Sequence, residues 1–343
     1  MLKEMRQLVI LLAVLLQVLA THGWTFFPPL DNHHFSTSDA PVPVIIDTDI
    51  GSDIDDSFAV VYAAQSSNLD IKLVVTCTDD TTARARITAK LLTIIGRDKD
   101  IPIGIGLKND NRTAHTLFDW ASSYDLSSYK GGVFEDGIEQ MGKIIMNSPT
   151  IVNIICIGPM TNFPELLKRY PSVAKKARIY AMAGSVNRGY HNSSTPVAEY
   201  NVHMCPWCMQ KFLSAGWQSI TFTPLDTCGT VILGAPHFAE MLAGENSTAL
   251  GLVSSLMYFC IFTNQYDCSA KSVYPVLYDT NAVLLMLPEA KDFIDFQELR
   301  LSVDDNGYTK VDNKHGVPVQ VALNWQSNGL EKFEESLAKT LTG

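Results

Sequence analysis

Short apolar runs alternate with longer stretches in which apolar residues recur every three or four positions along the first two thirds of the chain. Short continuous runs are typical of strands buried on both faces, and the longer period indicates helices. Strands are expected near 42–47, 71–77, 101–106, 151–157, 178–183 and 218–223. Helices are expected near 54–66, 81–96, 134–147, 161–170 and 205–215. The alternation predicts an open, mostly parallel α/β sheet with helices on both faces.

The pattern changes after about residue 235. Helices are expected there near 235–243, 247–263 and 279–287, then strands near 294–303, 308–312 and 318–324, and a closing helix at 328–341. We expect these helices and antiparallel strands to cap the carboxyl edge of the sheet. Because no repeat, low-complexity tract or Pro/Gly-rich linker divides residues 41–343, we expect a single domain there.

The amino terminus has the pattern of a secretory signal peptide. Lys3 and Arg6 precede an apolar run at 8–20, which predicts a signal peptide over residues 1–23 and a flexible segment over 24–40. The run is short for a transmembrane helix, so no stable membrane association is expected, although an uncleaved anchor stays open. Acceptor sequons for N-glycosylation begin at Asn111, Asn192 and Asn246. Together these features predict a secreted glycoprotein.

Composition is that of a large globular domain: 343 residues, 46% hydrophobic and only 18% charged. The formal charge of −10 argues against nucleic-acid polymers as partners, because no basic stripe is available to neutralise phosphates. A small neutral substrate remains compatible with this charge.

The chain has seven cysteines, and an exported protein would oxidise those within reach of one another. Cys260 and Cys268 are close enough in sequence to pair. The segment 205–208, Cys-Pro-Trp-Cys, has the spacing of a thioredoxin-like redox motif, but we favour a role without redox activity because its context differs. Cys77 and Cys156 fall in apolar strands and are expected to be buried free thiols.

An acidic cluster follows the first predicted strand. Residues 47–56 read Asp-Thr-Asp-Ile-Gly-Ser-Asp-Ile-Asp-Asp, so five carboxylates stand within ten residues. Such a cluster repels itself unless a cation is bound, and it lies at the carboxyl edge of the sheet, where open α/β sheets place their ligands. Carboxylate oxygens suit Ca²⁺ or Mg²⁺ rather than zinc.

Spacing separates the interpretations of this cluster. An EF-hand loop starting at Asp47 needs an oxygen ligand at its fifth position and Glu at its twelfth, where this chain has Gly51 and Phe58. A haloacid-dehalogenase-type phosphatase also begins with Asp-x-Asp, but it expects Thr or Val at Gly51 and leaves Asp55 and Asp56 unexplained. A solvated acidic turn fits poorly with the apolar run that leads into the cluster.

The cluster resembles the Asp-Thr-Asp-x-Gly-x-Asp-Asp signature of the nucleoside hydrolases, with two residues inserted before the final pair. Residues 157–162 are similar to the family's Gly-Pro-Leu-Thr-Asn turn and 181–184 to its Met-Gly-Gly strand end. Residues 196–201 are similar to its Ala-Glu-Phe-Asn segment and 278–283 to its His-Asp-x-x-Ala-Val. On these motifs the chain resembles a secreted member of the nucleoside hydrolase family, of the inosine-uridine preferring kind.

The resemblance implies the family's open, mostly parallel α/β fold and calcium-dependent hydrolysis of the N-glycosidic bond of ribonucleosides to ribose and free base. A calcium-held water would attack an oxocarbenium-like ribosyl centre. The implied calcium ligands are Asp49, Asp56, the carbonyl of Ile157, and Asp279, with Asp49 also taking the proton of the water. The implied substrate-binding residues are Asp55, Asp79, Met182, Glu199, Asn201 and Tyr278. The expected partner is a small nucleoside, and a homo-oligomer, either dimer or tetramer, stays open.

Several positions depart from the family pattern. Tyr278 stands where many members have a His suited to protonating a leaving purine; since tyrosine has a pKa near 10, another group such as His191, or aromatic stacking, would then activate the base. The family's ribose-binding Asn falls at Asp79 or Asp80, and Asp53 has no counterpart, so its role stays open. The aromatic residues Trp120, Tyr258, Phe259, Phe262 and Tyr266 could stack on a base or belong to the core. Two other functions remain open: a hydrolase of the same fold acting on another ribosyl or glycosyl compound, and a secreted ribose- or nucleoside-binding protein without turnover.

Overall fold

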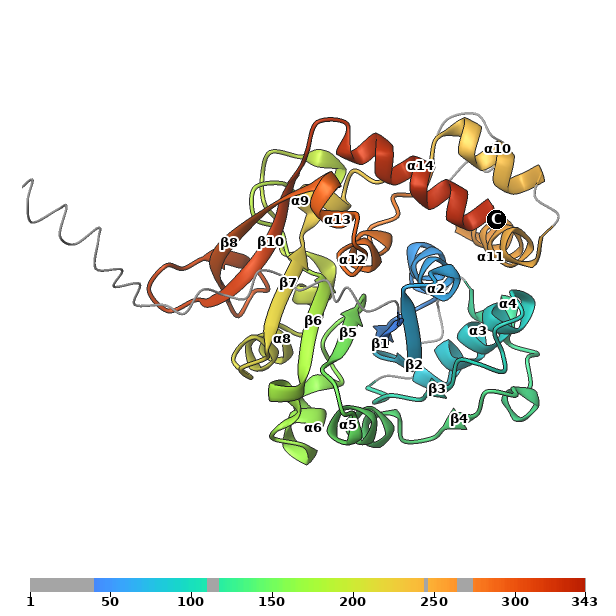
Figure 1. Cartoon of the computed structure of the whole chain (residues 1–343), viewed down its shortest axis with the longest axis horizontal. Helices are drawn as coiled ribbons and strands as arrows, with labels where there is room; N and C mark the ends of the chain where they lie inside the picture. Colours follow the sequence, from blue (N-terminus) through green and yellow to red (C-terminus); the bar gives the residue numbers. More distant parts are fainter. Residues whose placement is uncertain (1–39, 110–116, 244–245, 264–273, 343) are drawn as a thin grey trace, which may run out of the picture. The chain divides into compact units, whose positions relative to one another are not determined.

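A ten-stranded sheet forms the centre of the chain in the computed structural model, which describes residues 40–109, 117–243, 246–263 and 274–342 (Figure 1). The strand order is β4-β3-β2-β1-β5-β6-β7-β10-β8-β9. All neighbouring pairs from β4 to β10 are parallel, and only β10–β8 and β8–β9 are antiparallel. The predicted fold class, a mostly parallel sheet flanked by helices with antiparallel strands near the carboxyl terminus, is confirmed.

The predicted strands are present, with β3 reduced to two residues and the two-residue β4 in addition. Their bounds are β1 Val42–Thr48, β2 Leu69–Thr76, β3 Ile103–Gly104, β4 Val133–Phe134, β5 Val152–Cys156, β6 Ala177–Met182, β7 Ser219–Thr223, β8 Ile294–Val303, β9 Thr309–Val311 and β10 Val317–Trp325. The helices matching the predicted ones are α2 Asp55–Gln65, α3 Thr81–Ile94, α5 Gly137–Asn147, α6 Phe163–Arg169, α8 Pro206–Leu213, α10 Ala235–Ala243, α11 Ser247–Thr263, α12 Thr280–Leu284 and α14 Gly329–Thr342. Short helices that the sequence did not predict are α4 Phe118–Ala121, α7 Tyr200–His203, α9 Leu225–Cys228 and α13 Ala290–Phe293. None of the described helices combines the length and apolarity that a membrane span requires.

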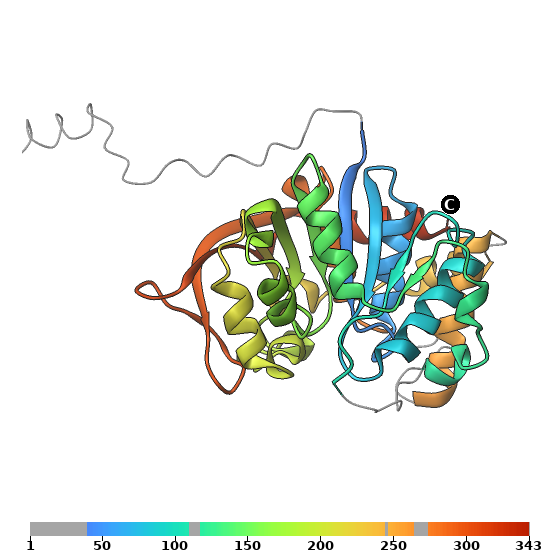
Figure 2. The ribbon, with the colours of Figure 1, turned by 90° about the horizontal axis from the view of Figure 1, so that it is seen from below.

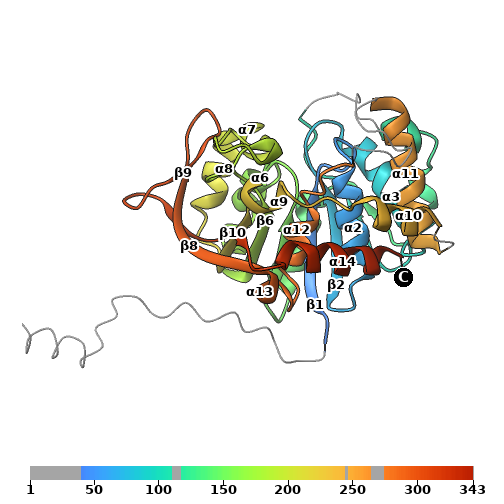
Figure 3. The ribbon, with the colours of Figure 1, turned by 90° about the horizontal axis from the view of Figure 1, so that it is seen from above.

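The sheet separates two hydrophobic cores because alternate strand residues face opposite sides. In β1, Val44 and Ile46 pack into the core shared with α2, α3, α11, α12 and α14, whereas Ile45 packs into the core shared with α5, α6 and α8. Viewed from below, the green and yellow-green helices of the second core lie in front of the strands (Figure 2). Viewed from above, α14 crosses the opposite side near α12 and α2 (Figure 3).

The strand order reverses beside β1. From β1 the chain adds β2, β3 and β4 in one direction, then returns to place β5, β6 and β7 on the other side. The loops that leave β1 and β5 therefore diverge to opposite faces, which opens a crevice at the carboxyl ends of these two strands. The acidic cluster follows β1 and lies at this switch point.

Candidate active site

A cavity of about 400 Å³ lies at the carboxyl ends of β1, β5 and β6. It gathers residues from four segments that are distant in the sequence. The lining residues are Asp49, Ser52, Asp53, Asp55, Asp56, Ile157, Met182, Tyr190, Glu199, Tyr200, Asn201, Tyr278 and Asp279. All the residues named from the sequence as calcium ligands line it, and so do all those named as substrate-binding except Asp79.

Three buried carboxylates form a tight group in this cavity. Asp55 and Asp56 begin α2, Asp279 immediately precedes α12, and one oxygen from each lies within 4.8 Å of the others. Burial raises the pKa of all three carboxyls, and their mutual repulsion raises it further. A divalent cation would remove both penalties, and the all-oxygen donor set fits a hard cation such as Ca²⁺ or Mg²⁺.

Neighbouring hydroxyl and amide groups fix these carboxylates in place. The Thr48 hydroxyl donates to Asp56 Oδ1 at 2.5 Å. Asn281 Nδ2 donates to Thr223 Oγ1 at 2.6 Å, which ties the start of α12, and with it Asp279, to the end of β7. These contacts hold Asp56 and Asp279 from two segments that are far apart in the sequence.

Asp49 lies in the same cavity but outside the group of three. Its Oδ2 accepts a hydrogen bond from the Ser52 hydroxyl at 3.1 Å and lies 3.9 Å from Nη2 of Arg84. Burial raises the pKa of the Asp49 carboxyl, and the Arg84 guanidinium opposes that rise. Asp49 therefore has other hydrogen-bond and ion-pair partners than the three grouped carboxylates, although it lines the same cavity.

The turn after β5 approaches Asp49 very closely. A Cβ built on Gly158 would lie 2.8 Å from the Asp49 main-chain nitrogen and 2.9 Å from its Oδ1. In the same motif, Asn162 Nδ2 donates to Asp47 Oδ2 at 2.6 Å, and Asn162 Oδ1 accepts from Leu107 N at 2.9 Å. The Gly-Pro-Met-Thr-Asn segment therefore packs the turn against the acidic loop, while its neighbour Ile157 lines the cavity.

Glu199 caps α7 and lines the cavity at the same time. Its carboxylate accepts hydrogen bonds from the main-chain nitrogens of Gly184 at 3.0 Å, Asn201 at 2.8 Å and Val202 at 3.3 Å. Burial raises the pKa of Glu199 to about 7, although these three donors lower it. Asn201 Nδ2 donates a hydrogen bond to the Met182 carbonyl at 3.2 Å. The cap explains how the Ala-Glu-Tyr-Asn segment is oriented toward the cavity.

Three tyrosines form the remaining wall. Tyr278 meets Tyr190 edge to face, with ring centroids 6.1 Å apart and planes at 85°. The Tyr190 hydroxyl accepts a hydrogen bond from the Tyr200 main-chain nitrogen at 2.9 Å. The sequence analysis assigned no role to Tyr190, Tyr200 or Ser52; Tyr200 stands inside a recognised motif, whereas nothing in the sequence marks Tyr190. Asp53, left open from the sequence, also lines the cavity.

Other predicted positions lie outside the cavity. Asp79 is buried against Arg84, with Nη2 to Oδ2 at 3.2 Å, and Asp80 caps α3 and pairs with Lys108 at 2.9 Å. His191 and Asn192 are exposed. The structure thus gives Asp79 an ion-pair partner where the sequence predicted a ribose contact.

The other candidate side chains divide between the core and the part not described. Trp120 and Phe259 are core residues. Asn246 Nδ2, the atom that would carry a glycan, donates to the Thr342 carbonyl. Outside the described residues or side chains lie the predicted signal peptide and the segment after it, Asn111, Tyr258, Cys260, Phe262, Tyr266 and Cys268.

The cysteines of the described part take two states. Cys205 and Cys208 form a disulfide at the start of α8. Cys77 and Cys156 are buried free thiols, as predicted, and Cys228 is a third. The Cys-Pro-Trp-Cys motif opens α8, the helix predicted near 205–215.

Residues 44–332 match the family model described as inosine-uridine preferring nucleoside hydrolase. The chain belongs to this family. A non-specific ribonucleoside hydrolase of Salmonella agona is 28% identical over 230 residues, which cover 64% of this chain and 72% of the relative.

Two solved structures share the nucleoside hydrolase fold. A plant nucleoside hydrolase superposes with a TM-score of 0.73 at 18% identity, covering 88% of this chain and 99% of the plant chain. A purine-preferring ribonucleoside hydrolase from Gardnerella vaginalis gives a TM-score of 0.67 at 16% identity, covering 88% and 99%. The family resemblance inferred from the motifs is confirmed, and the chain is a member of a family of hydrolases.

Proposed function

We propose that this nucleoside hydrolase family member cleaves the N-glycosidic bond of ribonucleosides and depends on calcium. The observation that carries the proposal is the buried group Asp55, Asp56 and Asp279, which shares one cavity with Asp49 and Glu199. Hydrolysis of a ribosyl bond needs carboxylates that bind the ribose hydroxyls and a general base that takes a proton from the attacking water. The cavity contains carboxylates suited to both roles.

Asp55, Asp56 and Asp279 would hold the calcium ion, with Asp49 and the carbonyl of Ile157 as further ligands by family resemblance. When bound, the ion would make water more acidic and orient the sugar hydroxyls. Asp49 then accepts the proton of the attacking water.

In this proposal the ribose and the nucleobase contact different walls of the cavity. Glu199 would accept hydrogen bonds from ribose hydroxyls, and Asn201 would form further hydrogen bonds with them. Met182 would pack beside the sugar. Tyr190 and Tyr278, which line the cavity, would face the departing nucleobase. In the described part of the chain no histidine lines the cavity, so a tyrosine hydroxyl or ring stacking would assist the leaving group.

We further propose that the chain enters the secretory pathway and carries N-glycans. The amino-terminal pattern over residues 1–23 and the exposed sequon residue Asn192 support this, and the Cys205–Cys208 disulfide fits an oxidising compartment. Expression in a eukaryotic host should give protein in the medium whose mass falls on treatment with an N-glycan-cleaving enzyme. Retention inside the cell at the unmodified mass would contradict the proposal.

Base release from inosine, uridine, adenosine and cytidine tests the activity directly. We expect turnover that exhaustive chelation abolishes and calcium restores. Asp49→Asn should lower kcat by about 10³-fold or more with a smaller change in KM, because it removes the proton acceptor and keeps an oxygen ligand. Glu199→Gln should also raise KM.

Each alternative has its own outcome in the same experiment. Activity that survives chelation would remove calcium from the mechanism, and an active Asp49→Asn would place the base elsewhere. Release only from other glycosyl compounds would indicate the related hydrolase. Calorimetric binding of ribose or nucleoside without release would indicate a binding protein.

A further inference from the structure

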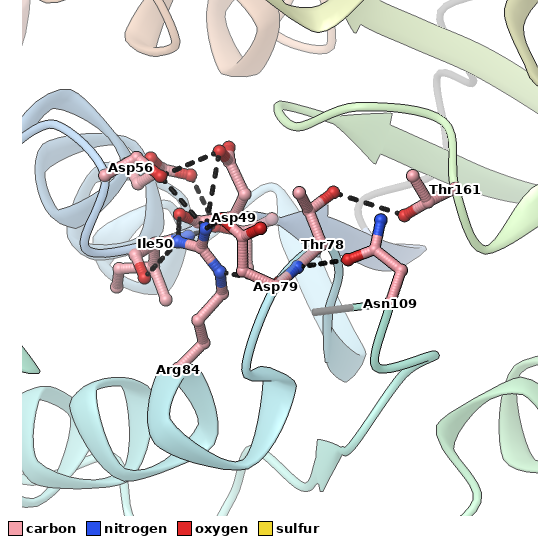
Figure 4. A network of polar contacts seen from close by, with 10 residues as sticks. Asp49, Ile50, Asp56, Thr78, Asp79, Arg84, Asn109 and Thr161 are labelled. Carbon is pink, nitrogen blue, oxygen red and sulfur yellow. Dashed lines mark hydrogen bonds and ion pairs between the residues drawn. The ribbon is translucent and has the colours of Figure 1, made fainter. Parts of the chain in front are cut away.

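Arg84 of α3 is fully buried directly behind Asp49, at 0% exposure. An isolated arginine is rarely buried, because removing its charge from water costs several kcal/mol unless its donors are paired. No motif in the sequence marks Arg84. Figure 4 shows its guanidinium lying among Asp49, Ile50 and Asp79.

The guanidinium holds the loop that carries Asp49, the proposed general base. Nη1 donates to the main-chain carbonyls of Asp49 and of Ile50, the latter at 3.0 Å. Nη2 donates to the Ser52 hydroxyl at 3.0 Å, and that hydroxyl donates in turn to Asp49 Oδ2 at 3.1 Å. One planar group therefore fixes both the backbone of Asp49 and, through Ser52, its carboxylate.

The same guanidinium also holds the neighbouring loop after β2. Thr78 and Asp79 both have positive φ angles, 67° and 55°, a left-handed conformation that is strained for residues other than glycine. Nε of Arg84 donates to the Thr78 carbonyl at 2.9 Å, and Nη2 pairs with Asp79 Oδ2 at 3.2 Å. Asn109 Oδ1 accepts from Asp79 N at 2.6 Å on the other side of the turn. Arg84 thus joins two loops that leave adjacent strands.

We propose that Arg84 is a positioning residue, which fixes the direction of the Asp49 carboxylate by clamping the loop after β1 against the strained turn after β2. The inference rests on the proposed function for its kinetic consequence. Arg84 acts through geometry: a planar fork with donors on three nitrogens is required, and the single ammonium of lysine cannot contact the same set of acceptors.

Arg84→Lys tests this proposal, with Arg86→Lys as the matched control on the same helix at a half-buried site. We expect kcat of Arg84→Lys to fall roughly 10- to 100-fold with KM within about threefold of the parent, because misplacing a general base slows proton transfer more than ground-state binding. The control should retain the parent kcat and KM. A parent-like kcat in Arg84→Lys would overturn the proposal.

Ser52→Ala tests the contact that runs from Arg84 through the Ser52 hydroxyl to the Asp49 carboxylate, and it leaves the Arg84 guanidinium in place. We expect kcat to fall roughly 3- to 10-fold at unchanged KM, and the double variant Ser52→Ala, Arg84→Lys to lose no more than Arg84→Lys alone, since both act through one contact chain. An unchanged kcat, a change confined to KM, or fully additive losses would overturn the route through Ser52. If Arg84→Lys does not fold, the kcat of Ser52→Ala tests the proposal.

The proposed function and this inference fail in distinguishable ways. If the parent protein releases no base from any nucleoside, the proposed function fails. The role of Arg84 in holding the loop is then tested by amide hydrogen exchange of residues 49–52. We expect exchange at least about tenfold faster in Arg84→Lys than in Arg86→Lys, because a loop with fewer hydrogen bonds opens more often. Equal exchange in the two variants would overturn the clamp itself.

Discussion

Tyr278 and Tyr190 meet edge to face on the wall of the cavity, beside Asp279. At the scale of single residues, Tyr278 stands where the family resemblance predicts a histidine suited to protonating the departing nucleobase. Since an unperturbed phenol has a pKa near 10, it would assist a departing base by hydrogen bonding or stacking rather than by full proton transfer.

Tyr278→Phe separates these possibilities. We expect little change with p-nitrophenyl riboside, whose leaving group needs no protonation, and about a tenfold lower kcat with inosine or uridine if the hydroxyl donates to the base. Steady-state kinetics on both kinds of substrate provide the measurement. Equal and large losses on both would show that Tyr278 supports the sugar or Asp279 instead.

At the scale of elements, the position of Asp49 depends on two turns, one after β1 and one after β5. The chain leaves β1 through Gly51, whose φ of 105° a side chain rarely adopts, and the turn after β5 brings Gly158 against Asp49. These two glycines allow two main-chain segments to approach more closely than side chains would permit.

Gly158→Ala should therefore displace Asp49. The added methyl would lie 2.6 Å from Cys77 Sγ as well as under 3.0 Å from Asp49, so we expect at least a tenfold loss of kcat and about 1–3 kcal/mol lower stability from overpacking. Kinetics and urea unfolding measure the two effects. Gly234→Ala is the control, because its nearest neighbour, Pro236 Cδ, would lie 3.9 Å away. Full activity in Gly158→Ala would contradict the close approach.

The whole molecule carries a group of buried carboxyls whose ionisation is linked to its stability. Burial raises the pKa of Asp47 and of Glu199 to about 7, and it also raises the pKa of Asp55, Asp56 and Asp279. Because the folded-state pKa values of Asp47 and Glu199 lie above the unfolded ones, the contribution of these two groups to stability is complete below about pH 4 and is lost as pH rises through about 7. A bound cation favours the ionised forms and opposes this loss.

We therefore expect the melting temperature of chelated protein to fall by several degrees between about pH 5.5 and pH 8. The increase on adding calcium should grow over the same interval, because calcium binds the ionised carboxylates. Differential scanning calorimetry across pH provides the measurement, with magnesium and potassium salts as controls for ion identity and ionic strength. A calcium effect that is equal at every pH would contradict the linkage.

The sequence by itself determined the order of strands and helices, the parallel α/β class and most of the cavity. Apolar runs specify buried strands, and Asp49, Asp56, Glu199 and Asp279 stand in motifs whose spacing is local. Short elements such as β4 and α7 escaped prediction because two to four residues carry little periodicity. The position of α7 also depends on a tertiary contact: Glu199, which caps this helix, accepts a hydrogen bond from Gly184 N after β6.

Only the tertiary structure decided which acidic residues meet and what lies behind them. It grouped Asp55 with Asp56 and Asp279, paired Asp79 with Arg84, and brought Tyr190 to the cavity. Except for the Asp79–Arg84 pair, these relations join segments far apart in the chain, and no local pattern encodes the distance between side chains that different strands present at one edge of a sheet. Arg84 shows the physical reason most plainly: its charge is tolerated without water only because the loops after β1 and β2 together supply its acceptors.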